Sequence, residues 1–210
     1  MSSNKSRPVK TRIALAPQRS HGKLRVAALL QAGAAVIAEK GYQAATMAEI
    51  AARAGAPIGS LYRFFPNKEI LADALLQRFG ELVNAAFEQI NARVKSLSMA
   101  ALADALLGLT TGLRGERLAA RAMLEAHSDW SVKRVEFRAT MRRNIARTLT
   151  LRQPRLRPKL ARDMAVVILQ NMKTADALTR ELRGEALSGA HTELREMTRL
   201  YLADKLGAKP

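Results

Sequence analysis

The segment from Thr46 to Lys68 gathers side chains that are suited to contact a polyanion. Gly59 and Ser60 are small enough to let the backbone approach another molecule closely, and Tyr62 combines an apolar ring with a hydroxyl group that can bind a thymine methyl or a phosphate. Thr46 offers a backbone N–H and a hydroxyl. Lys68 adds a positive charge at an expected helix N-terminus, where the helix dipole also favours an anion. These residue types at this spacing predict binding to DNA.

Residues suited to enzymatic chemistry do not form a comparable group. The three histidines, His21, His127 and His191, lie far apart in the sequence, and the chain contains no cysteine. No glycine-rich phosphate loop and no metal-ligand spacing occurs, and no pattern indicates a pair of catalytic carboxylates. We therefore expect no enzymatic activity, no cofactor and no metal. The lack of cysteine also fits a reducing cytoplasm.

The charge of the chain favours the same kind of partner. Its formal net charge is +17, and a strongly basic folded protein most often binds nucleic acid. Residues 1–38 contain seven basic residues and no acidic one, and residues 131–162 contain eleven basic residues against Glu136 alone. The chain shows neither a signal-peptide pattern nor a window that approaches 18 consecutive apolar residues, so we expect a soluble cytoplasmic protein without a membrane partner.

Short helices are predicted to position the residues of the first segment. An apolar helix is predicted over residues 23–40, and a Thr-x-x-Glu capping box at Thr46 begins a second helix that stops at Gly55. Pro57 suits the first turn of a third helix, since its missing N–H would be unpaired there. Two short helices joined by a turn that contains glycine form a helix-turn-helix, here over about residues 46–65.

The whole chain is predicted to be all-α. Apolar residues recur at spacings of three and four, and strand patterns are almost missing. We expect a flexible basic arm over residues 1–22, a three-helix DNA-binding head over 23–82 with Leu61 and Phe65 in its core, and a larger helical body over 83–210, linked to the head by the fourth helix. About nine helices are expected, and the later ones are predicted near 130–151, 158–183 and 190–206.

The helix-turn-helix resembles that of the tetracycline-repressor (TetR) family, over the residues GYQAATMAEIAARAGAPIGSLYRFFPNKEIL. The matching features are Gly-Tyr after the first helix, Thr at the start of the second, Ile-Ala before Ala-Gly, then Gly-Ser-Leu-Tyr and Phe-Pro-x-Lys-Glu. The match covers about residues 24–72. The resemblance implies a homodimeric, ligand-responsive bacterial repressor in which Thr46, Ser60, Tyr62 and Lys68 touch the backbone or bases of DNA.

Two positions depart from the family pattern. The family often has Ser or Thr at the position of Pro57 and His or Tyr at that of Phe64, so this head lacks two polar contacts to DNA. We expect the basic arm to compensate by placing Arg7, Arg12 and Arg19 in the adjacent minor groove; a disordered, solubilising tail is the alternative. The predicted DNA-binding residues are Thr46, Pro57, Ile58, Gly59, Ser60, Tyr62, Arg63, Phe64, Lys68, Arg12 and Arg19.

The body is predicted to contain an effector site and the dimer interface. Methionines and the single tryptophan can line an adaptable apolar pocket, or they can simply form the core. The last two helices of each subunit carry apolar stripes and are expected to form a four-helix bundle. The predicted ligand-binding residues are Met123, His127, Trp130, Phe137, Met141, Met164, Ile168 and Met172.

The predicted function is that of a repressor that binds a palindromic operator as a dimer and is released by a small molecule. A ligand-independent architectural DNA-binding protein also explains the charge, and an activator is possible within the same fold. The basic run 131–162 is either a solvated surface or a contact for an acidic ligand, an acidic partner or flanking DNA. A short palindromic footprint favours the regulator, whereas uniform coating favours the architectural protein.

Overall fold

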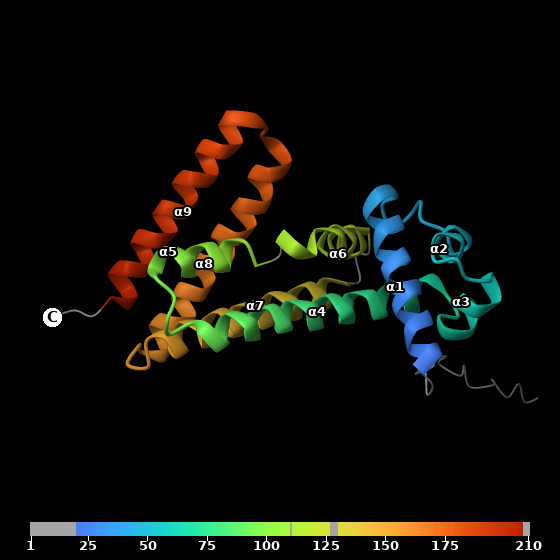
Figure 1. The fold of residues 1–210 in the computed structure, drawn as a ribbon, viewed down its shortest axis with the longest axis horizontal. Helices are drawn as coiled ribbons and strands as arrows, with labels where there is room; N and C mark the ends of the chain where they lie inside the picture. Colours follow the sequence, from blue (N-terminus) through green and yellow to red (C-terminus); the bar gives the residue numbers. More distant parts are fainter. Residues whose placement is uncertain (1–19, 110, 127–129, 208–210) are drawn as a thin grey trace, which may run out of the picture. The chain divides into compact units, whose positions relative to one another are not determined.

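The structure, a computed structural model, describes residues 20–109, 111–126 and 130–207. Within these ranges it consists of nine α-helices and one 3-10 helix without strands (Figure 1), which confirms the all-α prediction. The helices are α1 (Ser20–Lys40), α2 (Met47–Arg53), α3 (Ile58–Phe64), α4 (Lys68–Arg93), α5 (Met99–Leu107), η1 (Thr111–Leu113), α6 (Arg114–Ala126), α7 (Ser131–Arg152), α8 (Pro158–Glu181) and α9 (Gly184–Leu206).

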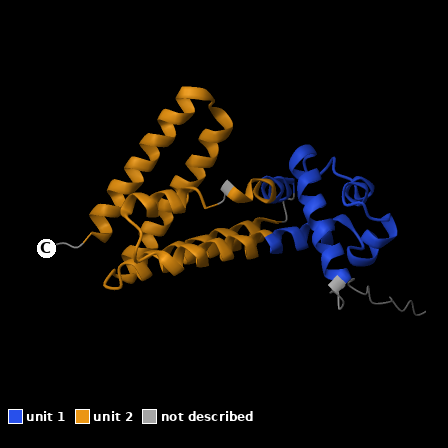
Figure 2. Ribbon diagram, viewed as in Figure 1, with its two compact units in different colours: residues 1–78, 118–126 blue, residues 79–117, 127–210 orange. Residues whose placement is uncertain are grey.

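The helices form two compact units (Figure 2). Unit 1 contains the described residues up to Arg78 together with Leu118–Ala126, and unit 2 contains Phe79–Arg117 and the described residues from Trp130 onward. The head predicted over 23–82 differs from unit 1 at its end and lacks Leu118–Ala126. The division falls inside the continuous helices α4 and α6, so no helix end marks it.

Unit 1 is built around α1, which packs against α2. Leu29, Ile37 and Ile50 are completely buried, and the predicted core residues Leu61 and Phe65 are 0% and 3% exposed. At Gly33, α1 packs against α4, since a Cβ at this position would lie 3.4 Å from Leu75 Cδ1, at about van der Waals contact. The helices of the helix-turn-helix therefore rest on a close-packed support.

Unit 2 is a helical body in which α7 packs on α8, α5 packs on α9, and α8 packs on α9. Its core contains completely buried side chains such as Ile145, Met164 and Leu202. The part of α4 that belongs to this unit is joined to α7, since Asn144 Nδ2 donates to Asn84 Oδ1 at 2.7 Å. The rings of Phe79 and Phe137 stack with their centroids 5.5 Å apart.

Two helix starts differ from the predictions. α1 begins at Ser20, so the last three residues of the arm predicted over 1–22 lie in its first turn; the other residues of the predicted arm lie outside the described ranges. The last helix begins at Gly184, not near residue 190, and continues through Gly189. A helix interior tolerates one glycine at a cost of about 1 kcal/mol relative to alanine, and the neighbouring Ala, Leu and Glu residues favour helix.

No described helix is long and apolar enough to cross a membrane.

Candidate nucleic-acid interface and a cavity in unit 2

The N-terminus of α2 is closed by the predicted capping box. Thr46 is the N-cap, and its Oγ1 accepts a hydrogen bond from the backbone N–H of Glu49 at 3.2 Å. In return, the backbone N–H and hydroxyl of Thr46 both donate to Glu49 Oε2, at 3.2 and 3.0 Å. Contact of Thr46 with a phosphate stays a prediction. Both groups that would make it are directed to the Glu49 carboxylate, which would first have to leave.

Two ion pairs tie α2 to α1. Lys40 pairs with Glu49, and Arg53 binds Glu39 through two hydrogen bonds of 2.8 and 2.7 Å. The hydrogen bond from Arg53 lowers the pKa of Glu39, and the hydrogen bond from Lys40 is the largest cause that lowers the pKa of Glu49. Because all four side chains are solvent-exposed, each pair adds little stability. The two pairs also compensate the positive charges of Lys40 and Arg53 within unit 1.

The helix α3, the second helix of the helix-turn-helix, presents one face to solvent. Ile58 and Tyr62 lie one turn apart and are 43% and 48% exposed, and a Cβ at Gly59 would meet no atom within 4 Å. Ser60 is half-buried and Arg63 is exposed. This face can therefore approach a duplex closely and offers an apolar contact and a hydroxyl.

Pro57 and Phe64 lie at the two ends of α3. Pro57 is the N-cap and makes no side-chain hydrogen bond to the helix, and it is exposed. Phe64 is half-buried, and the guanidinium of Arg63 lies 5.9 Å from the centroid of its ring, at the outer limit of a cation–π contact. Within the described part of the chain, Arg63 makes no ion pair, so its charge is available to a polyanion.

Lys68 is engaged inside unit 1. Its ammonium donates to the backbone carbonyls of Tyr42 (3.0 Å), Gln43 (3.2 Å) and Ala45 (3.1 Å), and lies 4.6 Å from the centroid of the Tyr42 ring. These bonds use all three N–H groups of a lysine ammonium. Contact with a DNA phosphate stays a prediction. The geometry supports another role, in which Lys68 holds the turn between α1 and α2 against the start of α4.

Arg12 and Arg19, the remaining predicted DNA-binding residues, lie outside the described residues, as does Arg7.

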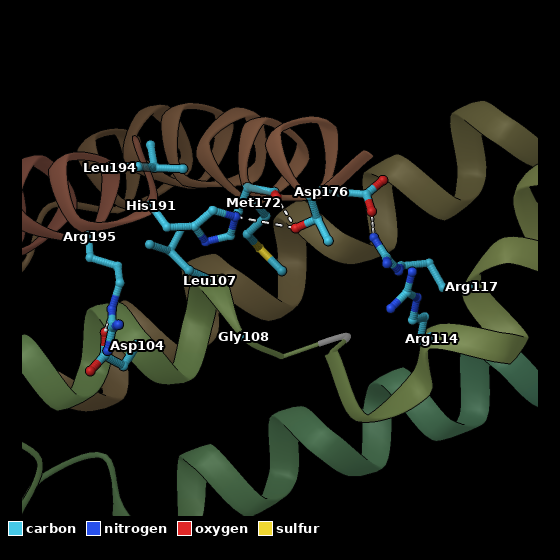
Figure 3. A pocket seen from close by; sticks show the side chains of 12 residues that line it. Asp104, Leu107, Gly108, Arg114, Arg117, Met172, Asp176, His191, Leu194 and Arg195 are labelled. Atoms are coloured by element: carbon cyan, nitrogen blue, oxygen red, sulfur yellow. Dashed lines mark hydrogen bonds and ion pairs between the residues drawn. The ribbon is translucent and has the colours of Figure 1, made fainter. Parts of the chain in front are cut away.

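A cavity of about 290 Å³ lies in unit 2, among α5, α6, α8 and α9 (Figure 3). We call it the α5–α9 cavity. Its apolar wall consists of Leu107, Met172, Ala175 and Leu194. Its volume is close to the lower end of the range for small-molecule sites.

Ion pairs between distant parts of the chain contribute to the lining of this cavity. Arg195 Nε lies 2.6 Å from Asp104 Oδ1, and this hydrogen bond lowers the pKa of the Asp104 carboxyl. Arg117 pairs with Asp176. Arg114 also lines the cavity and makes no ion pair within the described residues. Figure 3 shows these charged side chains entering from different helices.

The hydrogen bonding of Thr179 indicates which nitrogen of His191 carries a proton. Thr179 Oγ1 donates to the backbone carbonyl of Ala175 at 2.9 Å, and lies 3.2 Å from His191 Nε2. A hydroxyl has one proton to donate, so Thr179 accepts from His191 Nε2–H. In a neutral ring this leaves Nδ1 as an acceptor.

Of the predicted ligand-binding residues, only Met172 lines the α5–α9 cavity. Met141, Met164 and Ile168 are buried core side chains of unit 2. Trp130 is also buried, with the ammonium of Lys133 4.3 Å from its ring centroid. Phe137 stacks on Phe79, Met123 is a buried residue of unit 1, and His127 lies outside the described residues.

No signal in the sequence marks the polar residues of the cavity. Asp104 and Arg195 are 91 residues apart, and the members of each pair look like ordinary surface residues of separate helices. No group of three or more His, Asp or Glu residues in the described ranges has a metal-binding arrangement.

Exposed apolar side chains lie on the last two helices, where the dimer interface is predicted. Val166 and Val167 on α8 are 43% and 42% exposed, and Met197 and Leu200 on α9 are each 53% exposed. Leu169 and Leu194, on the same two helices, are buried in the subunit's own core and are not available to a partner.

Part of the basic run 131–162 is paired. Arg147 pairs with Glu88, and Lys159 Nζ lies 2.9 Å from Asp163 Oδ2. Arg138 and Arg142 lie near Lys173, whose pKa is lowered by burial and then by these two positive charges. The run is thus a mixture of paired and unpaired cations rather than a uniform stripe.

Comparisons with known proteins agree with the helix-turn-helix. Residues 29–75 match the family described as bacterial regulatory proteins, tetR family. Over 62 residues the chain is 42% identical to the HTH-type transcriptional repressor KstR2 of Mycobacterium tuberculosis. That match covers 30% of this chain and 31% of the repressor, so the chain matches about a third of the length of this curated relative.

Solved structures resemble the chain over most of its length. A transcriptional regulator (TerR/AcrR family) from Aquifex aeolicus VF5 has a TM-score of 0.68 and 21% identity, covering 84% of this chain and 99% of that one. The transcriptional regulator FadR from Bacillus subtilis, in complex with stearoyl-CoA, has a TM-score of 0.59 and 20% identity, covering 87% and 99%. At these identities the likeness shows a shared fold.

Proposed function

Because the chain belongs to the TetR family of bacterial regulatory proteins, we propose that it represses transcription by binding a palindromic operator as a homodimer, and that a small molecule releases it. The exposed face of α3 carries this proposal. An apolar side chain, a tyrosine and an uncompensated arginine lie beside an unobstructed glycine on a helix of the right length for the major groove. Operator DNA places the proposed site of action in the bacterial cytoplasm.

We assign direct contact with DNA first to Tyr62 and Arg63, with Ile58, Gly59 and Ser60 on the same helix. Apolar atoms of Ile58 and the Tyr62 ring fit a thymine methyl, and the Arg63 guanidinium fits a phosphate or a guanine edge. Pro57 and Phe64 are proposed to contact the duplex through van der Waals contacts alone, since neither side chain donates a hydrogen bond.

The proposed dimer uses the exposed apolar residues of α8 and α9. Val166, Val167, Met197 and Leu200 are exposed apolar side chains on two helices that pack on each other, and two such pairs of helices make a four-helix bundle. A two-fold dimer would present two copies of α3 to half-sites one helical turn apart, about 34–36 Å. This spacing explains why a short palindrome is expected.

We propose the α5–α9 cavity as the effector site. The helix α6 supports a link to DNA binding, because Arg114 and Arg117 line the cavity while Leu118–Ala126 of the same helix belong to unit 1. A shift of the first turn of α6 is transmitted along a continuous hydrogen-bonded helix.

Selection of bound DNA from a random pool tests this function, followed by footprinting of the selected sequence. The expected result is a short palindromic consensus and protection of two half-sites. Uniform coating without a consensus would instead support an architectural DNA-binding protein, which the charge of +17 also allows. In vitro transcription from a promoter that overlaps the selected site then distinguishes a repressor from an activator.

A further inference from the structure

The α5–α9 cavity has one more positive than negative side chain. Arg195 compensates Asp104, and Arg117 compensates Asp176, whereas Arg114 has no ion pair within the described residues. No other side chain that lines the cavity is acidic. A cationic ligand would therefore find no free carboxylate, while an anionic ligand would find a free guanidinium.

The surroundings of Arg114 strengthen this preference. Arg114 and Arg117 lie three residues apart on α6, where side chains are neighbours on the helix surface. Asp176, the partner of Arg117, also has Arg180 Nε at 3.6 Å. Arg117 and Arg180 thus share the Asp176 carboxylate, and Arg114 adds a third guanidinium to the same cavity without a carboxylate of its own. Like charges at this spacing repel, so a second carboxylate supplied by a ligand would relieve the repulsion.

Part of the cavity lining is apolar. Leu107, Met172 and Leu194 contribute to it, and a methionine adapts its shape to different apolar groups. If each non-hydrogen atom takes about 30 Å³, as a molecule does in liquid water, the volume of about 290 Å³ accommodates roughly ten such atoms.

We propose that the α5–α9 cavity binds a small organic carboxylate of roughly ten non-hydrogen atoms, with its charged end on Arg114 and its apolar part against Leu107, Met172 and Leu194. An arginine guanidinium holds a carboxylate through two parallel N–H···O bonds. This assignment rests on the proposed function, because it names the chemical class of the proposed effector.

Isothermal titration of the full chain with three ligands of equal chain length tests the charge preference. The ligands are sodium octanoate, neutral 1-octanol and cationic octylamine. Octanoate should bind at least about tenfold more tightly than 1-octanol, the difference expected from one charge-assisted contact, and octylamine should bind more weakly still. Equal binding of the three compounds, or no binding of octanoate, would overturn the proposal.

An arginine substitution locates the contact. Arg114→Gln removes the charge but keeps a polar side chain, so octanoate affinity should fall about tenfold or more while 1-octanol affinity stays the same. Arg121→Gln is the matched control. Arg121 lies on the same helix, pairs with Glu125 at 2.7 Å and does not line the cavity. Unchanged octanoate binding by Arg114→Gln, or an equal reduction by Arg121→Gln, contradicts the assignment, and thermal unfolding of both variants checks that they fold.

Binding to the selected operator, measured separately by fluorescence anisotropy, distinguishes failure of this inference from failure of the proposed function. If the chain binds a palindrome and is released only by compounds without an acidic group, the function holds and the carboxylate assignment is wrong. If the chain binds octanoate through Arg114 but selects no DNA sequence, the carboxylate assignment holds and the proposed function is wrong.

Discussion

Lys68→Met separates two roles for the lysine that follows the helix-turn-helix. If Lys68 bound a DNA phosphate, it would contribute to DNA affinity and hardly to the stability of the fold. The structure instead has the ammonium donating to the carbonyls of Tyr42, Gln43 and Ala45, which predicts that its main effect is on the stability of unit 1.

The size of the effect follows from the acceptors that are left behind. The hydrogen bonds to the carbonyls of Tyr42 and Ala45 are part-buried, whereas the one to the Gln43 carbonyl is exposed. Water can therefore replace the lysine ammonium only at the Gln43 carbonyl. An unsatisfied buried acceptor costs about 1–3 kcal/mol, and release of the ordered lysine side chain returns up to about 2 kcal/mol. We therefore expect Lys68→Met to lower the free energy of unfolding by about 2 kcal/mol.

Thermal unfolding and operator titration together measure this prediction. For a chain of this length, about 2 kcal/mol corresponds to a fall in Tm of roughly 4–8 °C. Lys23→Met is the matched control, since Lys23 is an exposed lysine of α1 with no ion pair in the described part of the chain, and its Tm should not change. The slope of log K against log[salt] for operator binding should stay the same in Lys68→Met. An unchanged Tm together with a slope reduced by about 0.9, the value for one phosphate that is no longer neutralised, would refute the reasoning.

Three further predictions follow from the described contacts. Tyr62→Ala should weaken operator binding about tenfold or more by removing an exposed base or phosphate contact, with unchanged Tm in a melting experiment. Phe64→His should strengthen operator binding severalfold, since an imidazole N–H can donate to a phosphate; equal affinity in an anisotropy titration would show that this head does not lack that contact. The hydrogen bond from Arg195 lowers the pKa of Asp104, so the pair stabilises the fold above the ordinary Asp pKa near 4 and loses this effect as pH falls through the lowered value. Asp104→Asn should therefore lose less stability than the parent chain between pH 4 and pH 2 in acid unfolding followed by circular dichroism.

Local signals explain why the head was predictable from the sequence. The capping box at Thr46 is present in both directions, and Gly41 and Gly55 have positive φ values of 81° and 58°, as expected of glycines that end helices. Each signal involves residues within a few positions of one another. Glycine is less decisive where no other residue stops the helix, and for that reason the predicted start of the last helix near residue 190 missed a helix that continues through Gly189.

Long-range contacts explain what the sequence did not reveal. The pairs Asp104–Arg195 and Arg117–Asp176 join helices that are distant in the chain, and no periodicity within one helix identifies them. The methionine stripes were identifiable as apolar, but whether they face a cavity or the core depends on the packing of several helices. The acceptors of Lys68 are backbone carbonyls, which every residue possesses, so residue types alone cannot indicate its partner.

The internal pairing of the head's cations leads to a last prediction, on the N-terminal arm. Lys40 and Arg53 are compensated by acids and Lys68 by carbonyls, which leaves few charges of the helix-turn-helix for the phosphates. The first 19 residues contain five Lys and Arg and no acid, and we expect them to supply much of the missing charge. Deletion of these residues should then weaken operator binding and reduce the slope of log K against log[salt] by about 0.9 for each phosphate that the arm had neutralised, up to roughly 4 to 5. A matched variant with all five residues changed to Gln should behave like the deletion. If both variants keep the parent slope, the arm does not contact DNA, and the charge that binds the operator must come from Arg63 and its neighbours.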